Sequence, residues 1–308
     1  MLFRSVLVYN PTPTSSQDQL TWFNRDGKRL GAAGSPGAHW QPSLSPDEKT
    51  VAVDQLDPQA GAQDLYLIDL ARDISTRFTF DPKIDIFPVW SADGGRIAFT
   101  SNRSGPFNLH HKISSGAGED ELILKAQNWE RPDDFSRDGR FLAYGDQDPK
   151  TKWDLWVLPL SGDRKPVPFL RTEFNELWAR FSPDGKWIAY ASDESKKEEV
   201  YVQSFPASGG KWQISTGGGS HPQWRRDGKE IFYLSADKKI MAVEVKVNST
   251  FHAGVPKALF DTRIPSGSFP SFTVTGDGQR FLLPTLLGEA AAPQPAAVVL
   301  NWTAAIKR

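Results

Sequence analysis

The sequence predicts an all-β fold, a β-propeller of four-stranded antiparallel blades. A block centred on an aspartate recurs along the 308 residues, short apolar strands follow each copy, and no amphipathic helix of useful length is visible. The recurring aspartates are Asp47, Asp93, Asp138, Asp184, Asp227 and Asp277, spaced by 46, 45, 46, 43 and 50 residues. Four-stranded units with a period of about 45 are typical of propeller blades, whereas a β-solenoid would have a shorter period.

Each repeat has a turn of the form Ser-Pro-Asp-Gly. The aspartate accepts backbone N–H bonds in a tight turn, and the following glycine adopts positive φ, as we expect for Gly139 and Gly185. Asp47 is followed by Glu48, which predicts a strained or differently shaped turn. The position three residues before each aspartate is predicted to pack between sheets, and it holds Leu44, Trp90, Phe135, Phe181, Trp224 and Val274.

The rest of each repeat supplies the remaining strands. A short apolar run such as Ile188-Ala189-Tyr190 follows each turn and predicts a buried second strand. A further strand pair follows, as in residues 154–160 with 166–170. We label the four strands of a blade A to D, in chain order.

The two ends leave the blade count open. Residues 5–10, 19–24 and 28–33 resemble strands B, C and D of a partial blade within 1–34, and the last repeat offers A (271–275), B (280–284) and C (296–303). This favours one domain, 1–308, with seven blades of which the first and last are incomplete. Six blades result if the N-terminal strands complete the last sheet. Open strand edges in the seven-blade arrangement predict a chain cut from a longer parent.

Composition excludes several classes of function. The formal net charge of -1 and pI near 6.5 give no basis for nucleic-acid binding. The absence of cysteine excludes disulfides, thiolate metal sites and a cysteine nucleophile. No stretch is long and apolar enough for a membrane span, and the N-terminus does not resemble an export signal.

The repeat sequence resembles that of two related groups of proteins. Ser-Pro-Asp-Gly followed by Ile-Ala-Tyr looks like the TolB-type propeller repeat, and segments such as LTWFNRDGKRLG, TKWDLWVLPLSGDRKP and VVLNWTA resemble the C-terminal propeller of bacterial serine/threonine kinases of the eukaryotic type. The likeness runs from about Gln19 to the C-terminus. It implies a sensory or docking role and a periplasmic or extracytoplasmic location, with the cytoplasm as the alternative. A kinase domain is missing from this sequence.

No residue pattern indicates catalysis or a cofactor. A GxSxG nucleophile elbow, a phosphate-binding GxxxxGK[ST] loop and kinase motifs are absent. Asp146, Asp148 and Asp154 suggest calcium, but the glycine of a calcium loop is missing, and we interpret them as solvated loop residues. His110 and His111 adjoin on a strand and point to opposite faces, so they do not share a metal. The sequence therefore predicts no metal site.

Loop geometry supplies the binding-site prediction. The loops before the A strands meet at one mouth of a propeller channel, where ligands commonly bind. We expect that mouth to be lined by His39, Trp40, Asp85, Trp129, Glu130, Arg131, Asn175, Glu176 and His221. Trp129 is the aromatic residue expected to be most exposed. Arg131 and His221 are expected at the surface, where substitution would cost little stability.

Two functions from different classes follow. The first is a non-enzymatic propeller that binds a protein, a peptide or a small polar ligand, as a sensor or docking module of a larger signalling protein. The alternative is a propeller hydrolase or lyase with an active site at the channel mouth. The first is favoured because the repeat accounts for nearly every residue and leaves no catalytic triad.

Overall fold

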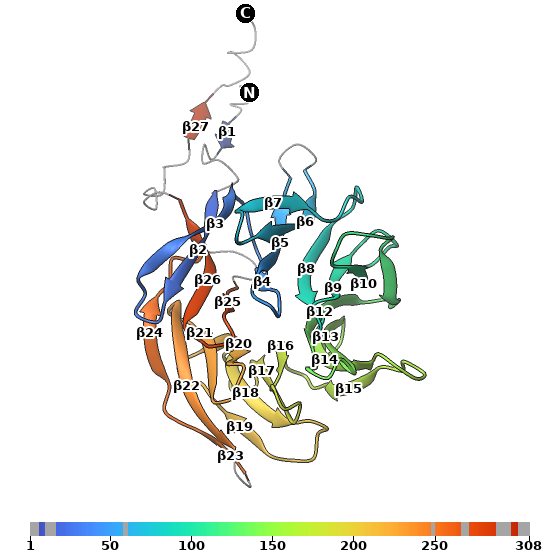
Figure 1. The fold of residues 1–308 in the computed structure, drawn as a ribbon, viewed down its shortest axis with the longest axis vertical. Coiled ribbons are helices and arrows are strands. Elements are labelled where there is room, and N and C mark those ends of the chain that lie inside the picture. The colour runs from blue at the N-terminus through green and yellow to red at the C-terminus, as the bar shows by residue number, and fades with distance from the viewer. Residues whose placement is uncertain are drawn as a thin grey trace, which may run out of the picture.

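The computed structural model describes residues 17–57, 61–247, 250–265 and 271–287, and the backbone of 6–9 and 297–300. In this part of the chain every regular element is a strand, and the strands form small antiparallel sheets arranged in a ring (Figure 1). The fold is therefore a β-propeller, as the sequence predicted. The described residues contain no helix with the length and apolar character that crossing a membrane requires.

Blades 1 to 3 follow one another along the chain, each with its strands in sequence order. Blade 1 contains β4 (Ser43–Leu44), β5 (Thr50–Leu56), β6 (Gln63–Asp69) and β7 (Ile74–Arg77). Blade 2 contains β8 (Asp85–Trp90), β9 (Arg96–Ser101), β10 (Asn108–Ile113) and β11 (Glu121–Leu124). Blade 3 contains β12 (Trp129–Phe135), β13 (Phe141–Asp148), β14 (Lys152–Pro159) and β15 (Val167–Leu170).

Blades 4 and 5 continue the pattern, and blade 5 has one extra strand. Blade 4 contains β16 (Glu176–Phe181), β17 (Trp187–Ser192), β18 (Glu199–Ser204) and β19 (Lys211–Gln213). Blade 5 contains β20 (Gly219–Trp224), β21 (Glu230–Ser235), β22 (Lys239–Val247), β23 (Phe251–Ala253) and β24 (Lys257–Asp261). Both β23 and β24 pair with β22, along different parts of it.

Blade 6 joins the two ends of the chain. It is built from β25 (Thr273–Val274), β26 (Arg280–Leu286), β2 (Asp18–Asn24) and β3 (Arg29–Gly37), in that order across the sheet. Strand β2 pairs with β26 from Asp18 opposite Leu286 to Asn24 opposite Arg280. This antiparallel pairing closes the ring with hydrogen bonds between residues more than 250 positions apart in the chain.

The propeller therefore has six blades, and the seven-blade arrangement favoured from sequence is wrong. Residues 19–24 and 28–33 are the outer strands of the last sheet, not part of a partial first blade. Residues 6–9 and 297–300, expected within strand B of a partial first blade and strand C of the last blade, instead pair with each other as β1 (Val6–Tyr9) and β27 (Ala297–Leu300). The remaining positions of the expected 5–10 and 296–303 strands lie outside the described residues.

The A–B turns confirm the expected backbone conformation. Gly139 and Gly185 have φ of 69° and 70°. Glu48 takes the same conformation with φ 62°, which is strained for a residue with a side chain. Its carboxylate accepts bonds from the Gly276 N–H at 2.8 Å and from Arg226 Nη2 at 2.9 Å, so the glutamate links the turn of blade 1 to those of blades 5 and 6.

The core lies between neighbouring sheets. Ile188, Ala189 and Tyr190 of β17 are each at most 1% exposed, which confirms the predicted buried second strand. Trp224, three residues before its turn aspartate, donates its indole N–H to the Arg180 carbonyl of the preceding blade at 3.1 Å. Trp90 bonds the Ser43 carbonyl in the same way at 3.0 Å, so these side chains fix one blade to the next.

Candidate functional site at the mouths of the central channel

The innermost strands of the blades, β4, β8, β12, β16, β20 and β25, surround the centre of the ring (Figure 1), and residues of all six line a cavity in the space between them, which we call the central channel. The channel has two mouths. The upstream mouth is formed by the loops that precede these strands and by the B–C loops, and the hairpin mouth is formed by the A–B turns. The sequence placed the binding site at the upstream mouth.

Side chains from blades 2, 3, 4 and 5 pack against one another between the two mouths. Irregularities in β8, β16 and β20 place Phe87, Trp178 and His221 at φ of 60°, 62° and 53°. The His221 ring stacks on Trp178 with centroids 4.0 Å apart, and the Arg131 guanidinium carbon lies 3.8 Å from the Trp178 ring centroid. Phe87 belongs to the same apolar cluster as Trp178. We call Phe87, Arg131, Trp178 and His221 the channel plug.

The plug is fixed by buried polar contacts. Asp133 Oδ1 lies 3.0 Å from both Nε and Nη2 of Arg131, and its Oδ2 accepts the Ala179 N–H of the next blade at 3.1 Å. Burial lowers the pKa of His221 well below its usual range, with Arg131 and Arg180 acting in the same direction, so the ring is neutral. The stack is therefore a packed structural cluster that the Arg131–Asp133 ion pair holds in place.

A cavity of about 230 Å³ lies on the hairpin side of the plug. Residues from all six innermost strands line it, and Phe87 and Trp178 are among them. Its walls carry both signs of charge, from Asp134, Arg180 and Arg226. Burial raises the pKa of Asp134 to about 6, although Arg180 and the Phe181 N–H oppose this. We call this space the channel cavity.

A second cavity, of about 470 Å³, opens at the upstream mouth between blades 1, 2 and 3. We call it the aromatic pocket. It is lined by Trp40, Asp54, Leu56, Gly61, Gln63, Ile84, Ile86, Phe87, Phe107 and Trp129. Trp129 stacks on Phe107 with centroids 4.8 Å apart and meets the edge of Trp153, so it is partly buried and less exposed than the sequence suggested. Phe87 lines both cavities and separates them.

The nine predicted site residues do not form one binding surface. Trp40 and Trp129 meet in the aromatic pocket. His39 is 4% exposed, with Nδ1 2.6 Å from Asp18 Oδ1, and it anchors the segment before β4 to β2. Asn175 donates its side-chain N–H to Asp193 Oδ2 at 2.7 Å, which stabilises the mouth of blade 4.

The charged residues of the prediction lie beneath the surface. Asp85, Glu130, Arg131 and Glu176 are at most 2% exposed, and His221 is 6% exposed. Burial raises the pKa of Glu130 to about 10, with nearby Asp146 adding to the effect, and raises the pKa of Glu176 to about 7. The expectation that Arg131 and His221 are surface residues is therefore wrong, because both pack within the plug.

Sequence reasoning missed the apolar residues of the aromatic pocket. Ile84, Ile86 and Phe107 occupy positions that resemble ordinary core positions in the repeat. The sequence did show an aromatic residue, Phe107, in the B–C loop of blade 2, which lies between the blades of Trp40 and Trp129, and Phe107 stacks on Trp129. Only the closed ring shows that these residues share one cavity.

Comparison with known proteins agrees with this architecture. Residues 25–167 match the family model of PD40, described as the TolB beta propeller domain. The solved structure of a putative TolB from Agrobacterium tumefaciens superposes with a TM-score of 0.73 at 18% identity, over 89% of this chain and 100% of that one. TolB from Acinetobacter baumannii gives 0.59 at 15% identity, over 91% and 66%.

The curated relatives include a Tol-Pal system protein and a peptidase. The Tol-Pal system protein TolB of Helicobacter pylori is 27% identical over 182 residues, which are 56% of this chain and 43% of that protein. Dipeptidyl-peptidase 5 of Porphyromonas gingivalis is 25% identical, over 64% of this chain and 37% of the peptidase. The chain thus spans less than half the length of these relatives, and their similarity leaves both binding and enzymatic functions open.

Proposed function

We propose that this chain is a non-enzymatic propeller that binds a polypeptide partner through the aromatic pocket. The observation that carries the proposal is the joining of three blades around one cavity walled by Trp40, Phe87, Phe107 and Trp129. Aromatic side chains in a concave site are the usual anchors of protein recognition, and 470 Å³ lies within the range of ligand pockets. The similarity to TolB proteins supports a protein partner.

The lining of the aromatic pocket favours a peptide that inserts an apolar side chain and carries a polar group beside it. Most of the lining is aromatic or aliphatic, and Asp54 and Gln63 provide the polar groups. Burial raises the pKa of Asp54 to about 6, and its Oδ1 accepts the Gln41 N–H at 2.9 Å. This revises the polar ligand expected from sequence toward a peptide that inserts an aromatic or branched side chain.

The strongly shifted titratable groups argue against catalysis at this mouth. Glu130, Glu176 and His221 have the perturbed pKa values typical of active sites, yet each is nearly inaccessible to a substrate. Their burial is explained by packing between strands. A hydrolase or lyase remains the alternative outcome of the experiment below.

The test is selection from a random peptide library with wild-type protein and two variants. Trp40→Glu places a charge in the pocket, and Phe80→Glu is the matched control, since Phe80 is 66% exposed and is not part of the lining. We expect enriched peptides with an apolar anchor, bound at least tenfold more weakly by Trp40→Glu and equally by Phe80→Glu. Equal loss or no loss in both variants contradicts the proposal, and cleavage of bound peptides detected by mass spectrometry supports the enzymatic alternative.

We further propose that the propeller serves as an extracytoplasmic sensor or docking module of a larger signalling protein. This proposal is supported by the resemblance of the repeat sequence to kinase-associated propellers and by the similarity of the chain to TolB proteins. The upstream reading frame tests this directly: a kinase domain followed by a membrane helix is expected, and an unrelated or absent upstream frame contradicts the signalling role.

A further inference from the structure

One row of residues crosses each blade at the upstream mouth, and the strand registers make these rows equivalent. Each row contains one residue from strand A, its partner on B and the partner of that residue on C. The rows are His39–Gln55–Asp64, Asp85–Ser101–Asn108, Glu130–Asp146–Asp154 and Glu176–Ser192–Glu199, and in blade 5 Gly219 is opposite Ser235. Among the four rows that the described residues complete, only that of blade 3 consists entirely of acidic residues.

The acidic side chains of blade 3 converge. Asp146, Asp148 and Asp154 each bring one carboxylate oxygen to within 4.8 Å of the others. Directly opposed like charges destabilise a sheet, so this arrangement has a cost that the other rows avoid. Two oxygens on opposite sides of a calcium ion are about 5 Å apart, because each Ca–O distance is about 2.3–2.6 Å.

One of these side chains is buried with an oxygen that has no hydrogen-bond partner in the described part of the chain. Asp154 is 0% exposed, and its Oδ1 has no hydrogen-bond partner among the described residues, while Oδ2 accepts the Thr151 hydroxyl at 2.6 Å. The sequence interpretation of solvated acidic residues is therefore wrong for Asp154. A buried, unpaired carboxylate oxygen needs a counterpart.

The basic groups near the cluster do not fill that role. Arg171 Nη2 lies 2.9 Å from Asp148 Oδ2, and its Nε lies 3.5 Å from Asp154 Oδ2, but the arginine side chain is 47% exposed. In blade 2 the equivalent positions of Asp146 and Asp148 are Ser101 and Arg103. The Arg103 side chain is 17% exposed and lies among the acids it neutralises.

We propose that Asp146, Asp148 and Asp154 form a calcium site at the upstream mouth of blade 3. The ligand set is oxygen only, which selects a hard cation, and calcium accepts irregular sets of 6–8 oxygens in which water completes the shell. The Lys150 and Thr151 N–H groups bond Asp148 Oδ1 at 2.7 and 3.4 Å and position one ligand. The cation occupies in blade 3 the electrostatic role that Arg103 has in blade 2.

The experiment titrates calcium chloride into chelator-treated, dialysed protein, with calorimetry and the melting temperature as readouts. Wild-type protein is expected to bind one calcium ion with a Kd of about 10⁻⁴–10⁻³ M or tighter and to melt at a higher temperature when loaded. Magnesium is expected to bind more weakly. Asp154→Asn is expected to weaken calcium binding at least tenfold.

A double variant keeps the test decisive if Asp154→Asn fails to fold. Asp146→Ser with Asp148→Arg transfers the blade 2 solution into blade 3 and is expected to fold and lose the calcium response. Asp138→Asn is the matched control, because it removes a carboxylate from the exposed A–B turn of the same blade. No binding by wild-type protein at 10 mM calcium, on the order of ten times the weakest expected Kd, overturns the proposal. Equal binding by the folded double variant also overturns it.

Discussion

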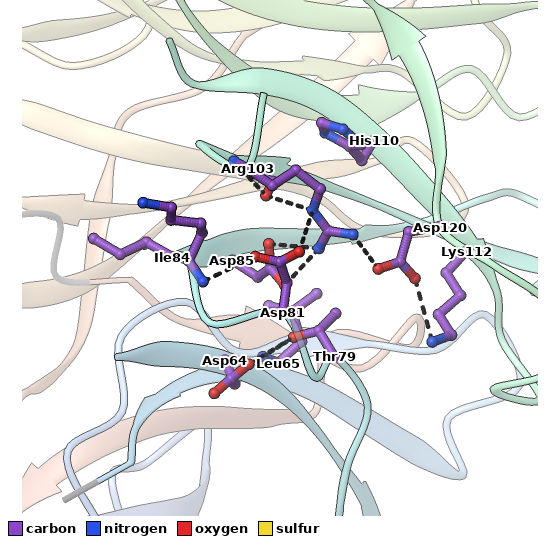
Figure 2. A network of polar contacts seen from close by, with 12 residues as sticks. Asp64, Leu65, Thr79, Asp81, Ile84, Asp85, Arg103, His110, Lys112 and Asp120 are labelled. Atoms are coloured by element: carbon purple, nitrogen blue, oxygen red, sulfur yellow. Dashed lines mark hydrogen bonds and ion pairs between the residues drawn. The ribbon is translucent and has the colours of Figure 1, made fainter. Parts of the chain in front are cut away.

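Blades 2 and 3 have the same strands in the same register, yet they differ in how they accommodate acids at the upstream mouth. In blade 2, Arg103 Nη2 lies 2.8 and 2.7 Å from the two oxygens of Asp85, and the guanidinium also pairs with Asp120 (Figure 2). Lys112 Nζ extends the network to Asp120 at 3.2 Å. The equivalent part of blade 3 has acids in place of Ser101 and Arg103.

The difference shows that a repeat fixes the backbone and leaves the charge balance of each blade free to vary. Both rows are compatible with the same strand pairing, because cross-strand geometry constrains side-chain position and not side-chain sign. Blade 2 satisfies its buried acids with a side chain of its own. Blade 3 has an incomplete set of partners, which is the basis for the calcium proposal.

Among these predictions, removing Arg103 from the ion-pair network of blade 2 is expected to cause the largest loss of unfolding free energy. Arg103→Ala leaves Asp85, which is 0% exposed, without its bidentate partner and removes the main partner of Asp120. Removing one member of a buried ion pair typically costs about 3–5 kcal/mol of unfolding free energy. Urea unfolding at neutral pH measures this.

Arg72→Ala is the control for that substitution. Arg72 pairs with Asp69 at 2.7 Å, but its side chain is 71% exposed, so we expect a loss of about 0.5 kcal/mol or less. Similar losses in the two variants would show that burial does not distinguish these pairs.

The second prediction uses the inner strands, where Asp134 of blade 3 occupies the register position of Val89 in blade 2. Burial raises the pKa of Asp134 to about 6 in the folded protein, against about 3.9 in the unfolded chain. The folded state therefore binds more protons between these values, so the stability contribution is present below pH 4 and is lost as pH rises through about 6.

Asp134→Asn is expected to reduce this pH dependence. A shift of about two pKa units corresponds to roughly 3 kcal/mol, so the fall in unfolding free energy between pH 4 and 7 is expected to shrink by about 2–3 kcal/mol. The asparagine side chain keeps an oxygen that can accept the Phe181 N–H, which Asp134 Oδ2 binds at 2.9 Å. Asp138→Asn, in an exposed turn where hydrogen bonds with Ser136 lower the pKa, is expected to leave this interval unchanged. An unaltered slope in Asp134→Asn would contradict the assignment.

Sequence reasoning succeeded where structure depends on neighbouring residues in the chain. The period, the buried strand of Ile188–Tyr190 and the positive φ of Gly139 all follow from local patterns. The prediction of how the ring closes was wrong because the pairing of β2 with β26 joins opposite ends of the chain. No local sequence pattern distinguishes this pairing from a missing blade.

The candidate site was predicted only in part, for a related reason. The loops before the A strands were correctly placed at one mouth, and Trp40 and Trp129 do share a cavity there. Burial of Arg131 could not be foreseen, because it depends on Trp178 and Asp133 being brought around it by irregular inner strands from two blades. A charged residue in a loop-like segment of sequence is ordinarily exposed.

The smallest expected effect comes from exchanging the single residue that most clearly separates the blades. Asp146 opposes Glu130 and Asp154, where blades 2, 4 and 5 have a serine. In chelator, Asp146→Ser is expected to raise the unfolding free energy by about 0.2–1 kcal/mol, because it removes the like-charge contact with Asp154 across the strands. The reciprocal change, Ser192→Asp in blade 4, places a carboxylate between Glu176 and Glu199 and is expected to lower stability by a similar amount.

Saturating calcium is expected to reverse the order of stability, so that the wild type becomes more stable than Asp146→Ser, since only the wild type gains binding energy. Asp146 Oδ1 also accepts the Asn128 side-chain N–H at 2.9 Å. If Asp146→Ser is destabilised equally with and without calcium, that hydrogen bond is the main role of Asp146, and the charge difference between the blades has no energetic consequence.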